Sequence, residues 1–170
     1  MRRPLVLTGA AAAGKSTCAR VLADQAARAA YIDVDDIRQL VRSGAAAPWE
    51  GPAGRAQLLL GATNACALGR NFLAAGFDVV IADVVTPDTA AVYRRELPDV
   101  LLVRLVVTFE EAQGRAATRP VHITDDEFAW VYRLDADAPP AADVVLHVDA
   151  WSVRQQVAAL AKLWRTRSPD

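Results

Sequence analysis

The chain has 170 residues, of which 53% are hydrophobic, and its formal net charge at pH 7 is −1. This composition is typical of one folded domain with its own core, and it excludes a disordered chain. The near-neutral charge argues against a protein that coats nucleic acid by charge alone, and no apolar run reaches the roughly 18 residues of a membrane span.

The chain contains two cysteines, Cys18 and Cys66. Their spacing is not that of a metal site, and two cysteines are too few for a disulfide scaffold. The first residues, MRRPLVLTG, begin basic and apolar, but this apolar run is too short for a signal peptide and is better explained by a buried strand. We therefore expect two reduced thiols in a cytoplasmic protein.

Apolar, β-branched runs alternate with helical patterns along the whole chain. The expected strands are residues 4–8, 29–33, 77–83, 100–107 and 143–148. The expected helices are residues 15–28, 35–43, about 53–75, 88–96, 109–117, 124–134 and 151–165. Strands that are apolar throughout and separated by helices indicate a parallel sheet covered on both faces. The order predicts one three-layer α/β/α domain spanning residues 1–170.

The first expected strand ends at Thr8 and is followed by GAAAAGKST, residues 9–17. This is the phosphate-loop pattern G-x-x-x-x-G-K-[S/T] between a strand and a helix, where backbone N–H groups surround a phosphate. Lys15 would reach the β- and γ-phosphates, and the Ser16 hydroxyl would bind Mg²⁺. The residues expected to hold the nucleotide are Gly9, Ala10, Ala11, Ala12, Ala13, Gly14, Lys15, Ser16 and Thr17.

Three aspartates, Asp33, Asp35 and Asp36, follow the second expected strand. They lie at the carboxyl edge of the sheet, where open α/β sheets bind ligands. A carboxylate there can accept the proton of an attacking hydroxyl or help to hold Mg²⁺. We expect Asp35 to be this base, with Arg38 on the same helix face. The alternative for each aspartate is a cap for the helix that begins near Asp36.

The third expected strand ends in Asp83. An apolar run followed by Asp is typical of the residue that positions Mg²⁺ beside the loop serine. Val84, rather than a glutamate that could activate water, follows Asp83, and this favours transfer to another acceptor over hydrolysis. The alternative is an ordinary strand-end aspartate.

Arg115 and Arg119 are four residues apart, which is one helical turn. Guanidinium groups clamp phosphate oxygens, and the position of this pair before Pro120 is typical of a lid at approximately residues 114–127. Trp49 lies in the irregular segment APWEGP, and we expect it to line the acceptor pocket, as aromatic rings commonly do. A role in covering the core is an equal alternative for Trp49.

Together these segments resemble the P-loop kinases related to chloramphenicol phosphotransferase and to the kinase domain of polynucleotide kinase. GAAAAGKST is similar to their nucleotide loop, and VDDIRQ, residues 34–39, is similar to the segment that holds their catalytic Asp. The resemblance implies that Asp35 is the base and that Arg38 contacts the substrate. VVIADVVTP and GRAATRPV are similar to their third strand and lid, which implies roles for Asp83 beside the acceptor and for Arg115 and Arg119 on the transferring phosphate.

The Asp-x-Asp of residues 33–35 also resembles that of shikimate kinase, which implies that Asp33 supports Mg²⁺. The resemblance implies a P-loop NTPase domain with five parallel strands in the order 2-3-1-4-5. It further implies ATP and Mg²⁺ as cofactors. It covers nearly the whole chain in order, although RSGAAAPWEGPAGRAQ, residues 42–57, matches none of these enzymes well.

The leading hypothesis is an ATP-dependent kinase that phosphorylates a hydroxyl of a small molecule, either a metabolite or an antibiotic. An alternative is a 5′-hydroxyl polynucleotide or nucleoside kinase, which Arg38 favours and the lack of a basic stripe opposes. A third hypothesis is a nucleotide-binding regulator without transfer activity, which the combination of Lys15, Ser16, Asp35, Asp83 and Arg119 argues against.

Overall fold

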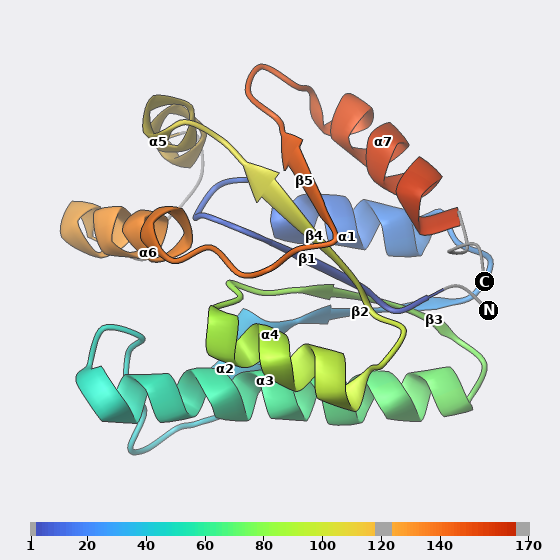
Figure 1. The fold of residues 1–170 in the computed structure, drawn as a ribbon, viewed down its shortest axis with the longest axis horizontal. Coiled ribbons are helices and arrows are strands. Elements are labelled where there is room, and N and C mark those ends of the chain that lie inside the picture. The colour runs from blue at the N-terminus through green and yellow to red at the C-terminus, as the bar shows by residue number, and fades with distance from the viewer. Residues whose placement is uncertain (1–2, 118–123, 166–170) are drawn as a thin grey trace.

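The computed structural model describes residues 3–117 and 124–165. Five parallel strands form one sheet in the order β2-β3-β1-β4-β5 (Figure 1). The strands are β1 (Leu5–Gly9), β2 (Ala29–Asp33), β3 (Asp78–Ala82), β4 (Leu101–Val106) and β5 (Val144–His147). The expected strand order and the three-layer architecture are confirmed, and each expected strand is present with ends that differ by at most one residue.

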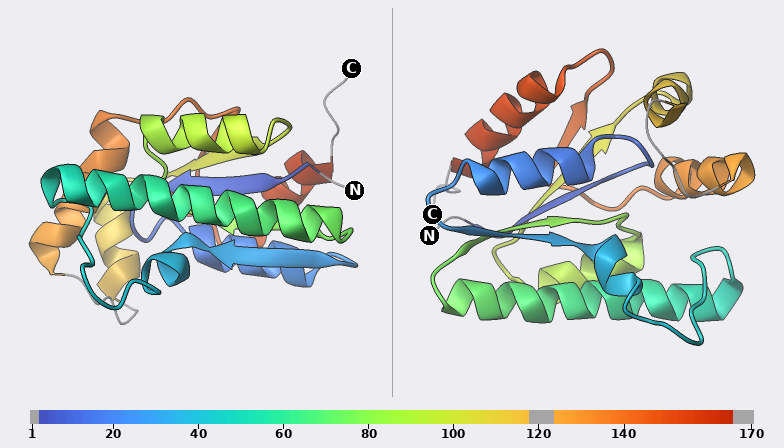
Figure 2. Two further views of the ribbon diagram at one scale, coloured as in Figure 1. Left: turned by 90° about the horizontal axis from the view of Figure 1, so that it is seen from below. Right: turned by 180° about the vertical axis from the view of Figure 1, so that it is seen from behind.

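The helices cover both faces of the sheet. They are α1 (Lys15–Asp24), α2 (Val34–Arg38), α3 (Gly51–Ala74), α4 (Pro87–Glu96), α5 (Phe109–Ala117), α6 (Asp125–Asp137) and α7 (Val153–Arg165). One face carries α1 and α7, and the other carries α3 and α4 (Figure 1; Figure 2). Helices α5 and α6 lie beyond the end of the sheet at which β1 ends. All five strands are parallel, so this is the carboxyl edge, where the site is expected.

Two helices end several residues earlier than their sequence patterns predict. Helix α1 ends at Asp24 rather than at residue 28, and α2 is also shorter than expected. The pattern indicates a helix over residues 35–43, but α2 ends at Arg38, with Gln39 as its C-cap. Leu40, which fits the apolar stripe of the longer helix, is 75% exposed. Without burial of an apolar face, few contacts stabilise further turns of so short a helix, because most helical stability comes from packing.

Side chains of the central strand β1 alternate between two parts of the core. Leu5 and Leu7 pack with the residues under α1 and α7, whereas Val6 packs with those under α3 and α4. Every residue of β1 is buried, as expected for a strand between two neighbours and two helical layers. This packing fixes the point from which the Gly9–Thr17 loop leaves the sheet.

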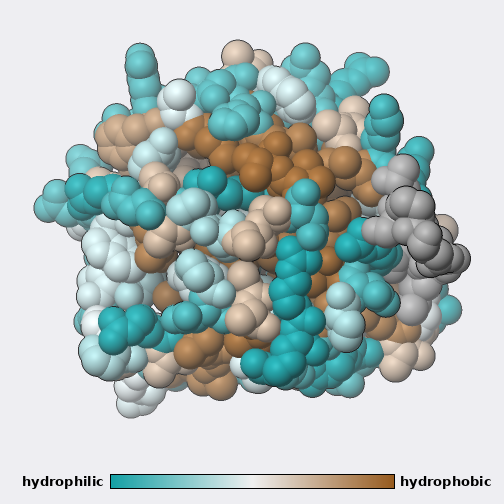
Figure 3. All heavy atoms as spheres, in the orientation of Figure 1, coloured by the Kyte–Doolittle hydropathy of each residue, from teal (hydrophilic) through white to brown (hydrophobic). Residues whose placement is uncertain are grey.

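An apolar region of the surface lies at the edge of the sheet that carries β5 (Figure 3). Figure 3 shows hydrophobic side chains gathered over the edge strand β5 and its neighbour β4, and Val145 of β5 is 47% exposed. Among the described residues, no helix combines the length and the apolar character that crossing a membrane requires.

Candidate functional site

Residues Gly9–Thr17 comprise the end of β1, the loop that joins it to α1 and the first residues of α1, and they include backbone conformations that favour glycine. Gly9 has φ 138°, and a Cβ atom built there would overlap the carbonyl oxygen of Leu105 on β4. Ala12 (φ 58°) and Gly14 (φ 100°) are also left-handed. Such residues turn the chain sharply, and in loops of this kind successive N–H groups can form an anion-binding concavity. The loop geometry therefore fits a phosphate group.

Lys15 is the first residue of α1, and its side chain folds back across the loop. Its Nζ donates a hydrogen bond to the carbonyl oxygen of Ala10, at 2.8 Å. Burial lowers the pKa of Lys15, and nearby carboxylates, of which Asp35 has the largest effect, oppose this shift. An ammonium group has three donors, so Lys15 can contact phosphate oxygens while it keeps this bond. Ser16 follows it and is exposed.

Asp33 ends β2 and caps α2. Its Oδ1 accepts a hydrogen bond from the backbone N–H of Asp35 at 3.1 Å, and its Oδ2 accepts one from the Tyr31 hydroxyl at 2.6 Å. Burial, together with this bond to Asp33, raises the pKa of Tyr31. The capping alternative is therefore confirmed for Asp33, and its role in holding Mg²⁺ stays a prediction. Residues 31 and 33 share one face of the strand, which is why the two side chains meet.

Asp35 and Asp83 both form ion pairs with Arg38, the last residue of α2. Arg38 Nη1 lies 2.7 Å from Asp35 Oδ1, and Arg38 Nη2 lies 2.6 Å from Asp83 Oδ1. The Asp35 side chain is 68% exposed, whereas that of Asp83 is fully buried. The exposed carboxylate is thus available to a ligand, and the buried one anchors the arginine.

Asp83 has a second partner, because its Oδ2 accepts a hydrogen bond from the buried Tyr93 hydroxyl at 2.8 Å. Burial raises the pKa of Asp83, while Arg38 and the Tyr93 hydroxyl oppose the shift by stabilising the carboxylate. Burial also acts to lower the pKa of Arg38, but Asp83 and Asp35 outweigh it and raise this pKa. Both oxygens of Asp83 already accept hydrogen bonds, from Arg38 and from Tyr93. The expected contact of Asp83 with Mg²⁺ stays a prediction.

Of the two arginines assigned to the lid, the structure describes Arg115. Arg119 lies outside the described residues. Arg115 of α5 donates from Nε to Glu111 at 2.9 Å and from Nη2 to the carbonyl oxygen of Val148 at 2.8 Å. These bonds connect α5 to the segment that follows β5. The roles of both arginines at the transferring phosphate stay predictions.

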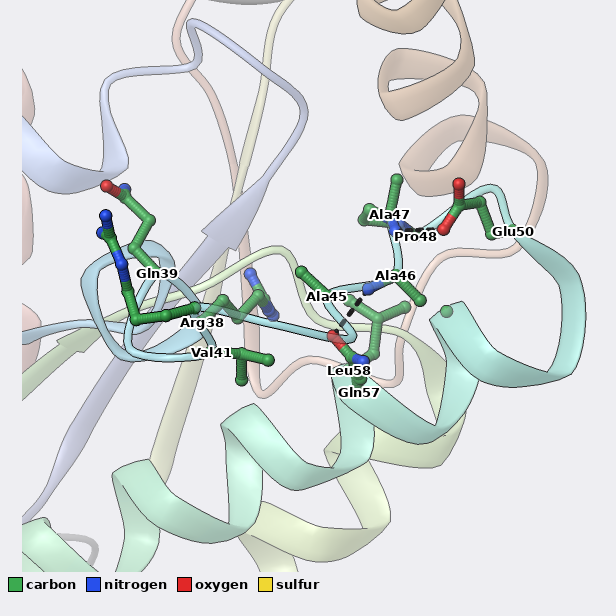
Figure 4. A pocket seen from close by; sticks show the side chains of 12 residues that line it. Arg38, Gln39, Val41, Ala45, Ala46, Ala47, Pro48, Glu50, Gln57 and Leu58 are labelled. Carbon is green, nitrogen blue, oxygen red and sulfur yellow. Dashed lines mark hydrogen bonds between the residues drawn. The ribbon is translucent and has the colours of Figure 1, made fainter.

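A pocket of about 570 Å³ lies between α2, the loop that follows it and the first turns of α3 (Figure 4). Gln57 of α3 fixes this loop by accepting from the Ala46 N–H and donating to the Gly44 carbonyl. Gly54 allows the loop to lie on α3, since a Cβ there would overlap the Ala47 carbonyl oxygen. The lining residues are Arg38, Gln39, Val41, Arg42, Ala45, Ala46, Ala47, Pro48, Glu50, Gly54, Gln57 and Leu58.

The expectation that Trp49 lines the acceptor pocket stays a prediction, and Trp49 is not among the residues that line the pocket between α2 and α3. Its ring instead packs edge-to-face against Trp130 of α6, with 5.8 Å between ring centroids. This contact joins the loop before α3 to the helix that follows residues 118–123. The two rings are 81 positions apart, so local sequence patterns contain no signal for the pair.

A buried ion pair near the loop was also not predicted. Arg104 of β4 is the register partner of Thr8 in β1, and its guanidinium binds the carboxylate of Asp135 in α6, at 2.8 Å for the shortest contact. The same guanidinium donates to the Asp135 carbonyl oxygen. Burial lowers the pKa of Lys15, and the charge of Asp135 opposes this shift, so its charge reaches the phosphate loop. Asp135 fits an ordinary polar helix position in the sequence, and only the tertiary structure shows its partner.

Comparisons with known proteins agree with this fold. No family model and no curated protein sequence matches the chain. A sugar kinase from a Janibacter species is 17% identical, with a TM-score of 0.70 over 96% of this chain and 94% of that one. A shikimate kinase from Acinetobacter baumannii is 22% identical, with a TM-score of 0.66 over 95% and 92% of the two chains.

A gluconokinase from Sinorhizobium meliloti is 19% identical, with a TM-score of 0.63 over 95% of this chain and 93% of that one. At such identities the likeness establishes the fold. The resemblance to chloramphenicol phosphotransferase and polynucleotide kinase stays a prediction. The chain has the three-layer fold of the P-loop kinases, and its architecture is like that of shikimate kinase.

Proposed function

We propose that the protein is an ATP-dependent kinase that transfers the γ-phosphate of ATP to a hydroxyl group of a small molecule. The observation that carries the proposal is the placement of an exposed carboxylate, Asp35, near a phosphate loop. Burial lowers the pKa of Lys15, and Asp35 is the carboxylate that opposes this shift most strongly, which supports a position of Asp35 close to Lys15. A base beside a phosphate-binding cation is the arrangement that phosphoryl transfer to a hydroxyl requires.

Each proposed residue has a role in the reaction. The backbone amides of the Gly9–Thr17 loop and Lys15 hold the phosphates, and Ser16 binds Mg²⁺ together with Asp33 or Asp83. Bound Mg²⁺ neutralises charge that develops on the phosphate oxygens. Arg119 and Arg115 act on the same oxygens.

The transfer itself involves few covalent changes. The acceptor oxygen forms a bond to the γ-phosphorus while the bond from that phosphorus to the oxygen bridging to the β-phosphate breaks, so ADP leaves. The hydroxyl proton passes to the Asp35 carboxylate, which Arg38 holds at the site. Arg38 and Trp49 are proposed to lie around the acceptor, with the buried Asp83 behind Arg38.

The structures similar in fold support a small-molecule acceptor, because they include a sugar kinase, a shikimate kinase and a gluconokinase. The net charge of −1 also gives little support to a polynucleotide acceptor. An antibiotic acceptor falls within the same chemical class of hydroxyl compounds.

The test is a screen of hydroxyl acceptors with γ-labelled ATP and Mg²⁺, covering sugars, sugar acids, hydroxylated antibiotics, nucleosides and 5′-hydroxyl oligonucleotides. We expect transfer to a small molecule in the wild-type protein and transfer that is slower by roughly 10²-fold or more in the Asp35→Asn variant. Transfer only to oligonucleotides, with affinity that falls steeply as salt rises, would identify the polynucleotide alternative. Tight ATP binding without transfer to any acceptor would instead indicate a regulator.

A further inference from the structure

The Arg38 side chain occupies a niche between α2, α3 and the end of β3. Its two terminal nitrogens bind Asp35 and Asp83, but its Nε is buried and has no hydrogen-bond partner among the described residues. A buried polar atom without a hydrogen-bond partner costs free energy. The Nε of Arg38 therefore stays buried only because neighbouring groups hold the guanidinium in this position. The position of the guanidinium therefore depends on the shape of the niche as well as on its two ion pairs.

Gly61 of α3 forms the wall of the niche next to this nitrogen. A Cβ atom built at Gly61 lies 3.2 Å from Arg38 Nε, 3.2 Å from Val34 Cγ1 and 3.3 Å from Arg38 Cγ. These separations are shorter than an ordinary van der Waals contact, so even a methyl group would press on both residues of α2. Glycine inside a helix is destabilising relative to alanine. The close approach of Arg38 supplies a physical reason for glycine here.

Tyr93 of α4 fixes the other end of the arrangement. Its hydroxyl donates to Asp83 Oδ2 at 2.8 Å, and its side chain is fully buried. Asp83 Oδ1 accepts from Arg38 at the same time. Because both oxygens are engaged, the carboxylate is held in one orientation, and the arginine is held with it.

We propose that Gly61 and Tyr93 are positioning residues, which hold the Arg38 guanidinium so that it keeps the Asp35 carboxylate in place for proton acceptance. Gly61 acts by leaving room for the guanidinium, and Tyr93 acts by orienting Asp83. Neither residue touches the reacting atoms. The catalytic part of this inference rests on the proposed kinase function, whereas the structural part concerns Arg38 alone.

The test compares Gly61→Ala with Gly69→Ala as its matched control. Both glycines are buried in α3, but a Cβ at Gly69 lies 3.7 Å from its nearest neighbour, Val79 Cγ1, which is an ordinary contact. Both changes make the same gain in helix propensity. Only Gly61→Ala should displace Arg38, so only it should shift the Arg38 Nε–H signal in ¹H–¹⁵N NMR spectra of the protein without nucleotide.

In turnover assays with ATP, Mg²⁺ and the acceptor found by the screen, Gly61→Ala should lower kcat roughly tenfold, with little change in the KM for ATP. A displacement of about 1 Å in a catalytic group can cost about 10²-fold, so a few tenths of an ångström should cost less. Tyr93→Phe removes only the hydroxyl and should produce the same split between kcat and KM. Gly69→Ala should match the wild type.

Three outcomes are distinguishable. An Arg38 Nε–H signal that does not move in Gly61→Ala, or that moves equally in Gly69→Ala, overturns the positioning role whatever the activity. A wild-type protein that phosphorylates no acceptor contradicts the kinase function, and with it the catalytic part of the inference, while the NMR comparison still reports on the niche. Equal losses of kcat in both glycine variants would mean that α3 tolerates no substitution, which also overturns the specific role of Gly61.

Discussion

Arg38 and Asp83 form an ion pair with 2.6 Å between Nη2 and Oδ1, although they are 45 positions apart in the chain. The pair joins the last residue of α2 to the end of β3, and it leaves Arg38 Nη1 to bind Asp35. A buried carboxylate, an arginine and an exposed carboxylate thus form one connected unit at the carboxyl edge of the sheet. This unit fixes where the proposed base lies relative to the phosphate loop.

Replacing Lys15 with alanine should reduce ATP-dependent turnover by roughly 10²-fold or more, because a positively charged donor to the transferring phosphate is lost. Nucleotide binding should be partly retained, since backbone amides of the loop remain. The measurement is steady-state transfer from labelled ATP. Lys162→Ala is the matched control, because Lys162 is the only other lysine and lies near the end of α7. Unchanged turnover in Lys15→Ala would contradict the phosphate-loop assignment.

Asp35→Asn keeps the size of the side chain but removes its charge and basicity. Phosphoryl transfer to the acceptor should fall by roughly 10²-fold or more, which is the usual contribution of a positioned acid–base group. The affinity for ATP, measured by titration calorimetry, should change little. Asp36→Asn makes the same change one residue further along the same short helix, where the side chain is also exposed, and should retain activity. If Asp36→Asn is the inactive variant instead, the base has been assigned to the wrong aspartate.

Two substitutions at Asp33 should separate its capping role from a role in metal binding. Asp33→Ala removes the cap on α2 and should lower the free energy of unfolding by about 0.5–2 kcal/mol, measured by denaturant titration. Asp33→Asn preserves a good capping residue and should lower it less. If Asp33 also supports Mg²⁺, the activity of Asp33→Asn should recover as the Mg²⁺ concentration rises. Activity that is low at every Mg²⁺ concentration would argue against the metal role.

The Trp49–Trp130 contact should contribute a measurable coupling to stability. Edge-to-face aromatic pairs are worth about 0.5–1.5 kcal/mol beyond the area they bury. A double-mutant cycle with Trp49→Leu, Trp130→Leu and the double variant should therefore give a coupling energy in this range. A coupling near zero would mean that the loop before α3 and α6 do not hold one another in solution. The fluorescence of Trp49, with the other three tryptophans replaced, would report whether an acceptor also reaches this ring.

The Cys66 thiol should be unreactive in the folded protein at pH 8. Burial raises its pKa from 9.0 to about 12, so the reactive thiolate is scarcely populated at this pH. Because the pKa of the Cys66 thiol is higher in the folded chain than in the unfolded chain, the protonated thiol stabilises the folded state below pH 9. This stabilisation is lost as the pH rises toward 12. Titration with a thiol reagent should modify both cysteines only after denaturation. Rapid modification of Cys66 in the native protein would show that the thiol is not buried in solution.

Residues close together in the sequence determined most of the fold and the phosphate loop. The strands and helices follow from apolar periodicity, and GAAAAGKST specifies its loop because glycines and a lysine at fixed spacing act within nine consecutive residues. The exceptions among the helices are α1 and α2, which both end several residues earlier than expected. In α2, Leu40 and Val41 continue a helical pattern that the chain does not follow. Whether an apolar residue is buried depends on what packs over it, and the described residues leave Leu40 75% exposed.

The arrangement of charges around the loop was decided by the tertiary structure. The sequence pointed to Asp35, Arg38 and Asp83 as separate candidates, but it contained no signal that one guanidinium would join them or that Tyr93 would hold Asp83. It likewise gave no sign that Arg104 would pair with Asp135, or that Trp49 would pack on Trp130 rather than line the pocket beside α3. These contacts connect different elements across the sheet edge, and their partners are set by strand order and helix packing. A local pattern can therefore identify which residues have side chains suited to binding or catalysis, whereas the packing of distant elements decides which of these side chains come into contact.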